Sequence, residues 1–158
     1  MESLPINLAP AEFLQQLDAI GPGVWGTLCE VTLDDGRSFD HCLAWENPRF
    51  SDKGNWISPE HVMEIRACRC RMPVKFAQLV QRAGESGMGY HIYVVELADK
   101  TSFVHLAGGL DIDLLNLPEG YSDQDVVNVL PHEGRERAEV QGYREVDDYQ
   151  SLEYARAV

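Results

Sequence analysis

The chain resembles itself at a distance of 64 residues. When residues 23–66 are laid over residues 87–130 without a gap, nine of the 44 positions are identical. Average composition gives roughly two or three such matches by chance. The identical pairs are Gly23/Gly87, Val31/Val95, Leu33/Leu97, Asp35/Asp99, Ser38/Ser102, Phe39/Phe103, His41/His105, Ser58/Ser122 and Val62/Val126. Self-similarity at a fixed spacing is typical of repeated structural units. We therefore predict two copies of one unit, near residues 23–71 and 87–135.

A short helix is predicted in front of each copy. Residues 11–20 space their apolar side chains as an amphipathic helix does, and Gly21 ends the pattern. Residues 73–83 repeat this pattern between Pro73 and Gly84.

Strands are predicted to follow each helix. In the first copy, alternating apolar residues indicate strands at 25–33, 38–45 and 62–72. The Asp-Asp-Gly-Arg sequence at 34–37 favours a tight hairpin turn between the first two strands. In the second copy Lys100 stands where the first has Gly36, so we expect a turn of different geometry there.

Within a copy, a hairpin, a variable arm, one tight helical turn and a closing strand follow one another. This order resembles that of SH3-like small β-barrels over roughly 45 residues of each copy, and it concerns architecture only. The predicted fold is α+β and mostly β, a duplication of a small SH3-like antiparallel barrel or sheet unit. We expect a first repeat at 1–72, a second at 73–135 and a charged C-terminal helix or arm at 136–158. The two repeats could still pack as one domain.

The charge balance argues against anionic partners. Thirteen Lys and Arg stand against 26 Asp and Glu, which gives a formal net charge of −13. Such a surface repels nucleic acid and anionic membranes, so neither is an expected partner. The start of the chain shows no signal-peptide pattern, and its four cysteines are expected to be reduced thiols. We therefore expect a cytoplasmic protein.

The aromatic and basic residues suggest a surface that binds a partner. Trp25, Trp45 and Trp56 all belong to the first copy. Tryptophan is enriched at interfaces, although core packing would also explain one or two of the three. Arg66, Arg69 and Arg71 lie in an acid-free stretch that could bind a partner or pair with the protein's own acids.

Two further sets of residues could carry chemistry. His41 and His105 occupy equivalent positions and could form a pseudo-symmetric ligand or acid–base site, or each could be a hydrogen-bonded histidine of a half-buried strand face. Cys68 and Cys70 would share one face of a strand, which makes them weak candidates for metal binding or thiol chemistry. Buried, inert thiols are the simpler interpretation.

These observations favour a non-catalytic interaction protein whose partner is another protein. No cofactor and no metal are expected, and homo-oligomerisation is left open. One alternative is a small metal- or thiol-dependent enzyme with a site at the repeat interface. Another is an acidic protein that neutralises a basic partner.

Overall fold

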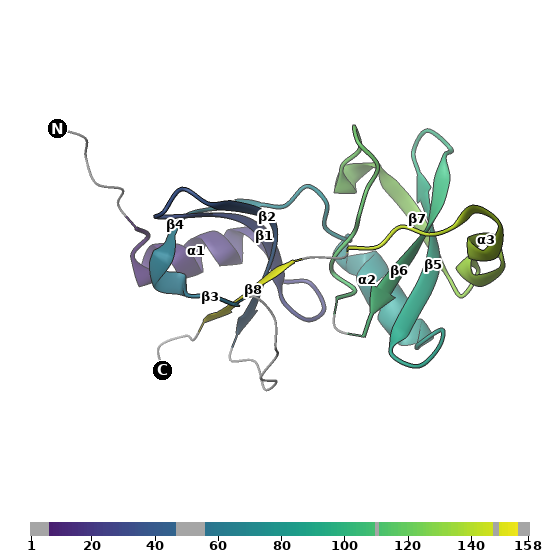
Figure 1. Ribbon diagram of the computed structural model, residues 1–158, viewed down its shortest axis with the longest axis horizontal. Coiled ribbons are helices and arrows are strands. Elements are labelled where there is room, and N and C mark those ends of the chain that lie inside the picture. Colours follow the sequence, from purple (N-terminus) through teal and green to yellow (C-terminus); the bar gives the residue numbers. More distant parts are fainter. Residues whose placement is uncertain (1–6, 47–55, 110, 147–148, 155–158) are drawn as a thin grey trace. The chain divides into compact units, whose positions relative to one another are not determined.

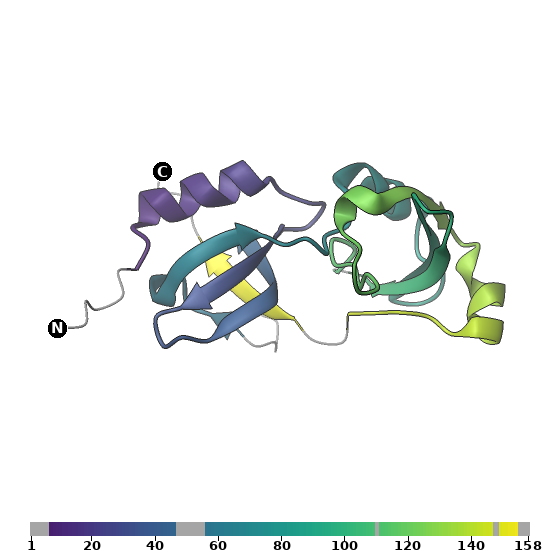
Figure 2. The ribbon, with the colours of Figure 1, turned by 90° about the horizontal axis from the view of Figure 1, so that it is seen from above.

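The computed structural model describes residues 7–46, 56–109, 111–146 and 149–154. Within these residues the fold is α+β and mostly β, with three α-helices and two sheets (Figures 1 and 2). The chain divides into two compact units. Unit 1 comprises residues 1–22, 26–68 and 148–158, and unit 2 comprises residues 23–25 and 69–147.

The first helix of unit 1, α1 (Pro10–Ile20), confirms the predicted helix. Proline suits the first position of a helix, because the N–H that it lacks has no partner within the helix there. Gly21 follows the last helical residue and ends the helix with a φ of 87°, a conformation that glycine adopts at little energetic cost.

The sheet of unit 1 has five strands in the order β3-β8-β2-β1-β4. The strands are β1 (Thr27–Leu33), β2 (Ser38–Glu46), β3 (Trp56–Ile57), β4 (Val62–Ala67) and β8 (Gln150–Tyr154). Strand β1 pairs antiparallel with β2 and β4, whereas β8 pairs parallel with β2 and β3. Of the C-terminal segment at 136–158, expected as a helix or arm, residues 150–154 therefore supply a strand to the first unit, whereas residues 136–141 are helical.

Helix α1 covers one face of this sheet, as Figure 2 shows. Phe13 and Leu17 are its buried residues, and they belong to one cluster with the inward side chains of the strands. The buried strand residues of this core are Cys29, Val31, Leu33, Cys42, Ala44, Ile57, Val62, Ile65 and Leu152.

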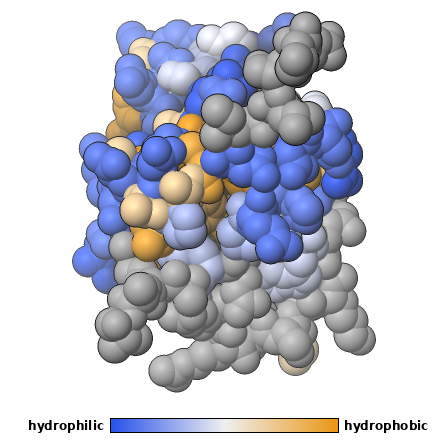
Figure 3. Space-filling view, turned by 90° about the vertical axis from the view of Figure 1, so that its left-hand side faces the viewer, coloured by the Kyte–Doolittle hydropathy of each residue, from blue (hydrophilic) through white to orange (hydrophobic). Residues whose placement is uncertain are grey.

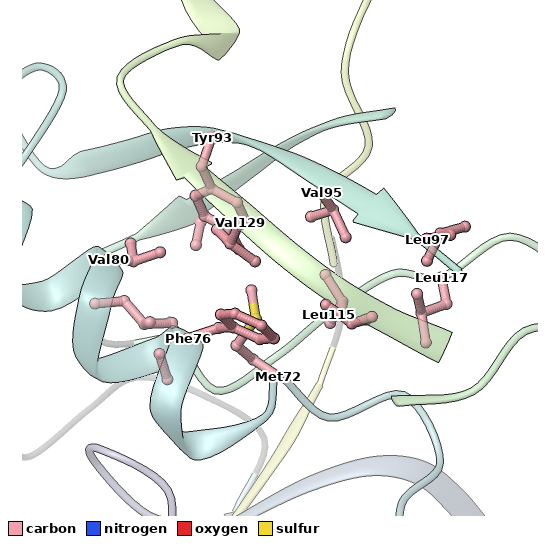
Figure 4. Packing of buried hydrophobic residues seen from close by; sticks show 13 residues of the cluster. Met72, Phe76, Val80, Tyr93, Val95, Leu97, Leu115, Leu117 and Val129 are labelled. Carbon is pink, nitrogen blue, oxygen red and sulfur yellow. The ribbon is translucent and has the colours of Figure 1, made fainter. Parts of the chain in front are cut away.

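Unit 2 is built on a three-stranded antiparallel sheet in the order β6-β5-β7. Its elements are α2 (Val74–Ala83), β5 (Tyr90–Leu97), β6 (Ser102–Gly108), β7 (Val126–Pro131) and α3 (Gly134–Gln141). Helix α2 packs on the face that carries Tyr93 and Val95 (Figure 4). Helix α3 begins on the opposite face at Gly134, where an added Cβ would lie 2.9 Å from the Val104 side chain.

The core of unit 2 joins α2, the sheet and the segment between β6 and β7. Figure 4 shows Phe76 and Val80 of α2 directed toward Tyr93 and Val129 of the sheet. The remaining buried members of the cluster are Met72, Ala77, Val95, Leu97, Ala107, Ile112, Leu115, Leu117 and Val126.

The pairing of the first strand with the closing strand follows the same register in both units. Strand β1 pairs with β4 from Cys29↔Ala67 to Leu33↔Val62, and β5 pairs with β7 from Tyr93↔Pro131 to Leu97↔Val126. Each residue of the second set lies 64 positions after its counterpart, and both ladders carry an irregularity at their last pair. A 3₁₀ turn precedes the closing strand in each unit, η1 (Pro59–His61) and η2 (Asp123–Asp125).

Two sequence-based expectations require correction. Strand β4 ends at Ala67 and not at residue 72, because Cys29↔Ala67 is the last pair that β1 offers it. The hairpin turn at Lys100 has the same geometry as the turn at Gly36, with φ of 72° against 89°. Its backbone N–H donates to the carbonyl of Leu97, just as the N–H of Gly36 donates to Leu33.

Neither sheet closes on itself within the residues that the structure describes. Closure into an SH3-like barrel therefore stays a prediction from the order of the elements. Among these residues, no helix combines the length and the apolar character that crossing a membrane requires.

Candidate functional site

A hollow of about 870 Å³ lies in unit 1 beside the turn between β1 and β2. Ligand sites in proteins commonly have volumes of ~300–1,000 Å³. The hollow is lined by Leu33, Asp34, Asp35, Arg37, Phe39, Trp56, Ile57, Ser58, His61 and Gln150.

Several segments of unit 1 bring these residues together. The tight turn at 34–37 supplies the charged side chains, and β2 adds Phe39. Strand β3 supplies Trp56 and Ile57, turn η1 and the residue before it supply His61 and Ser58, and β8 contributes Gln150 at its start. The hollow is therefore complete only when the C-terminal strand is in place.

The acidic side chains of the hollow are paired with nearby cations. His61 Nδ1 lies 3.1 Å from Asp34 Oδ2. This hydrogen bond is the main cause that lowers the pKa of Asp34 and raises the pKa of His61. Arg37 Nε donates to Asp35 Oδ2 at 2.7 Å, and hydrogen bonds from the Arg37 backbone and side chain lower the pKa of Asp35. Both carboxylates are therefore charged at neutral pH, as exposed aspartates ordinarily are.

Two aromatic side chains give the hollow its apolar surface. Trp56 is 37% exposed. Phe39 is half-buried, and the Arg37 guanidinium lies 5.8 Å above its ring centre. An aromatic face beside a cation is the arrangement of a cation–π interaction. The hollow thus offers ring faces and carboxylates to a ligand.

The three predicted tryptophans do not form one surface within a unit. Trp45 lies with Trp56 in unit 1, and its indole nitrogen is buried without a hydrogen-bond partner among the described residues. Trp25 belongs to unit 2 and is 40% exposed. Only Trp56 lines the hollow.

Two of the three predicted arginines approach acids of their own unit. Arg66 lies 3.9 Å from Glu30 and 3.7 Å from Glu64. Arg71 Nε donates to Asp123 at 3.3 Å. Arg69 is exposed, and its backbone carbonyl accepts from the Asp123 N–H. The internal pairing considered in the sequence is thus present for Arg66 and Arg71.

Equal spacing in the sequence does not give His41 and His105 equivalent places in the strand pairing. The β1–β2 ladder shifts register between Cys29 and Val31, so that Asp40 and His41 together oppose one residue of β1. Such a bulge moves one residue out of the ladder. Cys29 therefore pairs with Cys42, whereas Tyr93, which lies 64 positions later, pairs with His105.

His105 is fully engaged in the core of unit 2. Its Nε2 accepts the backbone N–H of Asn116 at 3.0 Å, so Nδ1 carries the proton and donates to the Tyr93 hydroxyl at 2.9 Å. Burial, and then the charge of Arg144, lower the pKa of His105 to about 3. His41 is half-buried in unit 1, where burial lowers its pKa. The hydrogen-bonded interpretation thus describes His105.

Cys68 and Cys70 both follow the end of β4, and Cys70 lies in a turn. Cys68 is buried, and Cys70 packs partly buried against the core of unit 2. The argument from a shared strand face does not apply to them. In the part of the chain that the structure describes, no three His, Cys, Asp or Glu side chains are grouped as metal ligands would be.

Asp113 has a structural role that the sequence did not reveal. Its buried carboxylate accepts the backbone N–H groups of Val24 at 2.6 Å and Trp25 at 2.8 Å. The contact is so close that a Cβ on Gly23 would lie 2.2 Å from Asp113 Oδ1. The identical Gly23/Gly87 pair hinted that Gly23 matters, but nothing in the sequence pointed to this partner.

A serine–histidine contact was also missed. Ser86 Oγ lies 3.2 Å from His132 Nδ1, and His132 Nε2 donates to the Ala83 carbonyl at 2.8 Å. Ser86 Oγ also accepts the N–H of Ile92 at 2.9 Å. These bonds tie the end of α2 to the residue that follows β7. The two side chains are 46 positions apart, so no local motif announces them.

Figure 3 looks onto unit 1 and shows apolar residues gathered on this face among polar ones. A second hollow of about 500 Å³ in unit 1 has a more apolar lining than the first. It is lined by Leu8, Pro10, Phe13, Leu14, Ser58, Pro59, Glu60 and Tyr154. It lacks the paired charges that give the first hollow a chemical preference.

Comparisons of the chain with protein-family models, with curated proteins and with solved structures found no match.

Proposed function

We propose that the protein is a non-catalytic interaction protein whose first unit binds a segment of another protein. The observation that carries this proposal is the hollow in unit 1, where the Trp56 and Phe39 rings lie beside charged side chains. Aromatic anchors in a pocket typically supply most of the binding energy at protein interfaces. A volume of about 870 Å³ is enough for several side chains of a bound segment.

The charge of unit 1 favours a basic segment as the partner. The sequence of this unit contains 13 acidic and five basic residues, a net charge of −8. Opposite charge steers association and selects partners, mainly through the rate of encounter. Asp34 and Asp35 carry this charge into the hollow. A Lys or Arg of the partner would compete with Arg37 for the Phe39 ring and the Asp35 carboxylate.

We further propose that units 1 and 2 descend from one duplicated SH3-like unit and that unit 1 is the copy kept for binding. The support is the shift of 64 residues, which relates the strands, the 3₁₀ turns and the β1–β4 register to their counterparts. In unit 2 the position of Phe39 is held by Phe103, which the Arg144 guanidinium faces at 5.9 Å. We also propose a cytoplasmic location, supported by four cysteines that are all free thiols.

The proposal is tested by selecting random displayed peptides on the immobilised full-length protein at physiological salt. We expect selected peptides rich in Lys and Arg, and we expect Trp56→Ala to weaken their binding at least tenfold. The matched control is Trp25→Ala, which removes an equally exposed indole from unit 2 and should leave affinity within twofold.

Selected peptides without a basic preference would defeat the choice of partner. Equal loss of affinity in both variants, or loss only in Trp25→Ala, would place the binding surface elsewhere.

A further inference from the structure

Two cysteines face each other across the β1–β2 hairpin of unit 1. Cys29 and Cys42 are Cα partners in the antiparallel ladder, both are 0% exposed, and both side chains belong to the same core cluster. Directly opposed residues of antiparallel strands have Cα atoms ~4.5–5.5 Å apart. A disulfide spans Cα separations of ~4.4–6.8 Å. The backbone therefore already satisfies the main geometric demand of a cross-link.

The two thiols also interact in their reduced form. Cys29 Sγ donates a hydrogen bond to the Cys42 carbonyl at 3.5 Å. The hydrogen bond with the Cys29 side chain, followed by burial, raises the pKa of Cys42. The Cys29 thiol thus already contacts Cys42 before any oxidation takes place.

Unit 2 carries a different pair at the corresponding place. Tyr93 and His105 are cross-strand partners there, with stacked rings whose centres are 5.4 Å apart. That pair is held by a hydrogen bond and cannot be oxidised to a covalent link. At this position of the hairpin, a cross-strand disulfide can therefore form only in unit 1.

We propose that Cys29 and Cys42 are a site of reversible disulfide formation, with hydrogen peroxide as the oxidant. In the first step one sulfur attacks a peroxide oxygen, and the O–O bond breaks to give a sulfenic acid and water. In the second step the other sulfur attacks the sulfenic sulfur and displaces a second water. Two electrons pass from the sulfurs to the peroxide, and both thiol protons leave in water.

The reaction is slow while the hairpin is closed. The thiolate is the reactive species, and burial together with the raised pKa of Cys42 keeps it scarce. Oxidation therefore proceeds when the strands open, and the disulfide then holds them together. The disulfide therefore accumulates during sustained oxidation and does not form during a brief exposure to the oxidant.

The cross-link encloses the turn that shapes the hollow. Five of its lining residues lie between the two cysteines: Leu33, Asp34, Asp35, Arg37 and Phe39. Oxidation thus limits the movement of half the lining. Any effect on partner binding rests on the proposed function, whereas the disulfide itself does not.

The test oxidises the full-length protein with hydrogen peroxide, blocks the remaining thiols with iodoacetamide and maps peptides by mass spectrometry. We expect a Cys29–Cys42 cross-link, reversal by dithiothreitol, and a rise in melting temperature on the order of 10 °C. The cross-link should be absent in Cys29→Ser and unchanged in Cys70→Ser. Low urea should accelerate its formation.

The proposal would be overturned if, after oxidation, Cys29 and Cys42 are each modified without being joined to one another. It would also be overturned if either is joined to Cys68 or Cys70. The same holds if no link forms even in low urea. A cross-link that leaves the affinity for a selected basic peptide unchanged would remove only its influence on the hollow. If no such peptide exists but the cross-link forms, the proposed function fails and this inference stands.

Discussion

Single buried polar groups hold structural positions in unit 2, and His105 is the strongest example. Inside unit 2 its ring makes two hydrogen bonds in place of those it would make to water, and the ring must stay neutral to make them. A histidine that must stay neutral when folded destabilises the fold once the unfolded chain can take up a proton.

The first prediction follows from the pKa of about 3 for His105. The free energy of unfolding should be unaffected by this residue above about pH 6.5 and should fall as the pH decreases from 6.5 towards 3. The slope is roughly 1.4 kcal/mol per pH unit for one proton. Urea titrations followed by circular dichroism between pH 7.5 and pH 4.5 measure it.

His105→Gln should be less stable at pH 7.5 but should show a flatter dependence on pH. His41→Gln is the matched control, since that ring is only half-buried, and it should change the slope less. An unchanged slope in His105→Gln would contradict the assignment.

The second prediction concerns Asp113. Replacement by Ala leaves the N–H groups of Val24 and Trp25 without their acceptor, and an unsatisfied buried donor costs ~1–3 kcal/mol. We expect a loss of that size in the free energy of unfolding. Asp111→Ala, two positions away, should cost less, because the pKa of that carboxyl is raised by burial and no backbone donor from residues 24–25 depends on it. Equal losses in the two variants would refute this role.

At the scale of elements, the two hairpin turns share one geometry, but the residue with positive φ is Gly36 in one and Lys100 in the other. The left-handed conformation costs a non-glycine residue roughly 1–2 kcal/mol. A glycine at this position avoids that cost but loses more conformational freedom on folding, which offsets part of the gain. Lys100→Gly should therefore stabilise the protein by about 0.5–1 kcal/mol, and Gly36→Ala should destabilise it by a similar or larger amount. Thermal unfolding of both variants decides the matter. Destabilisation by Lys100→Gly would show that the lysine side chain has another role.

Strand β8 joins β2 to β3 and contributes to the core of unit 1. Leu152 is 0% exposed in its core, and replacing a buried Leu by Ala costs ~2–5 kcal/mol. We expect Leu152→Ala to lower the free energy of unfolding by an amount in this range. The control Leu79→Ala, in an exposed position of α2, should change it by less than about 0.5 kcal/mol. A small effect at Leu152 would mean that β8 is not required.

Local patterns in the sequence were sufficient to predict most helices and strands, but not to predict which strands pair with one another. Both predicted helices form, because apolar spacing and the glycines that end them act within a few residues. Strand β8 was missed because its pairing with β2 joins residues about a hundred positions apart. The bulge at Asp40–His41 was missed because it depends on the facing strand, and it is what places Cys42 opposite Cys29.

At the scale of the whole molecule, the two similar units differ in the features on which the proposals rest. Unit 2 fills its core with Tyr93 and His105, whereas unit 1 carries the hollow, the higher negative charge and the oxidisable pair. The residues of the proposed binding hollow could not be predicted as a set, because the three tryptophans are equally prominent in the sequence. Only the fold separates Trp56, at the hollow, from Trp25, in the other unit.

The most direct test of the central claim maps a selected basic peptide onto the ¹⁵N-labelled full-length protein by NMR. Binding in the hollow should shift the backbone amides of residues 33–39 and 56–61 most strongly, together with the indole N–H of Trp56. The amides of β5 and β7 should remain unchanged. Shifts concentrated in unit 2, or scattered evenly over both units, would contradict the claim that unit 1 is the binding unit.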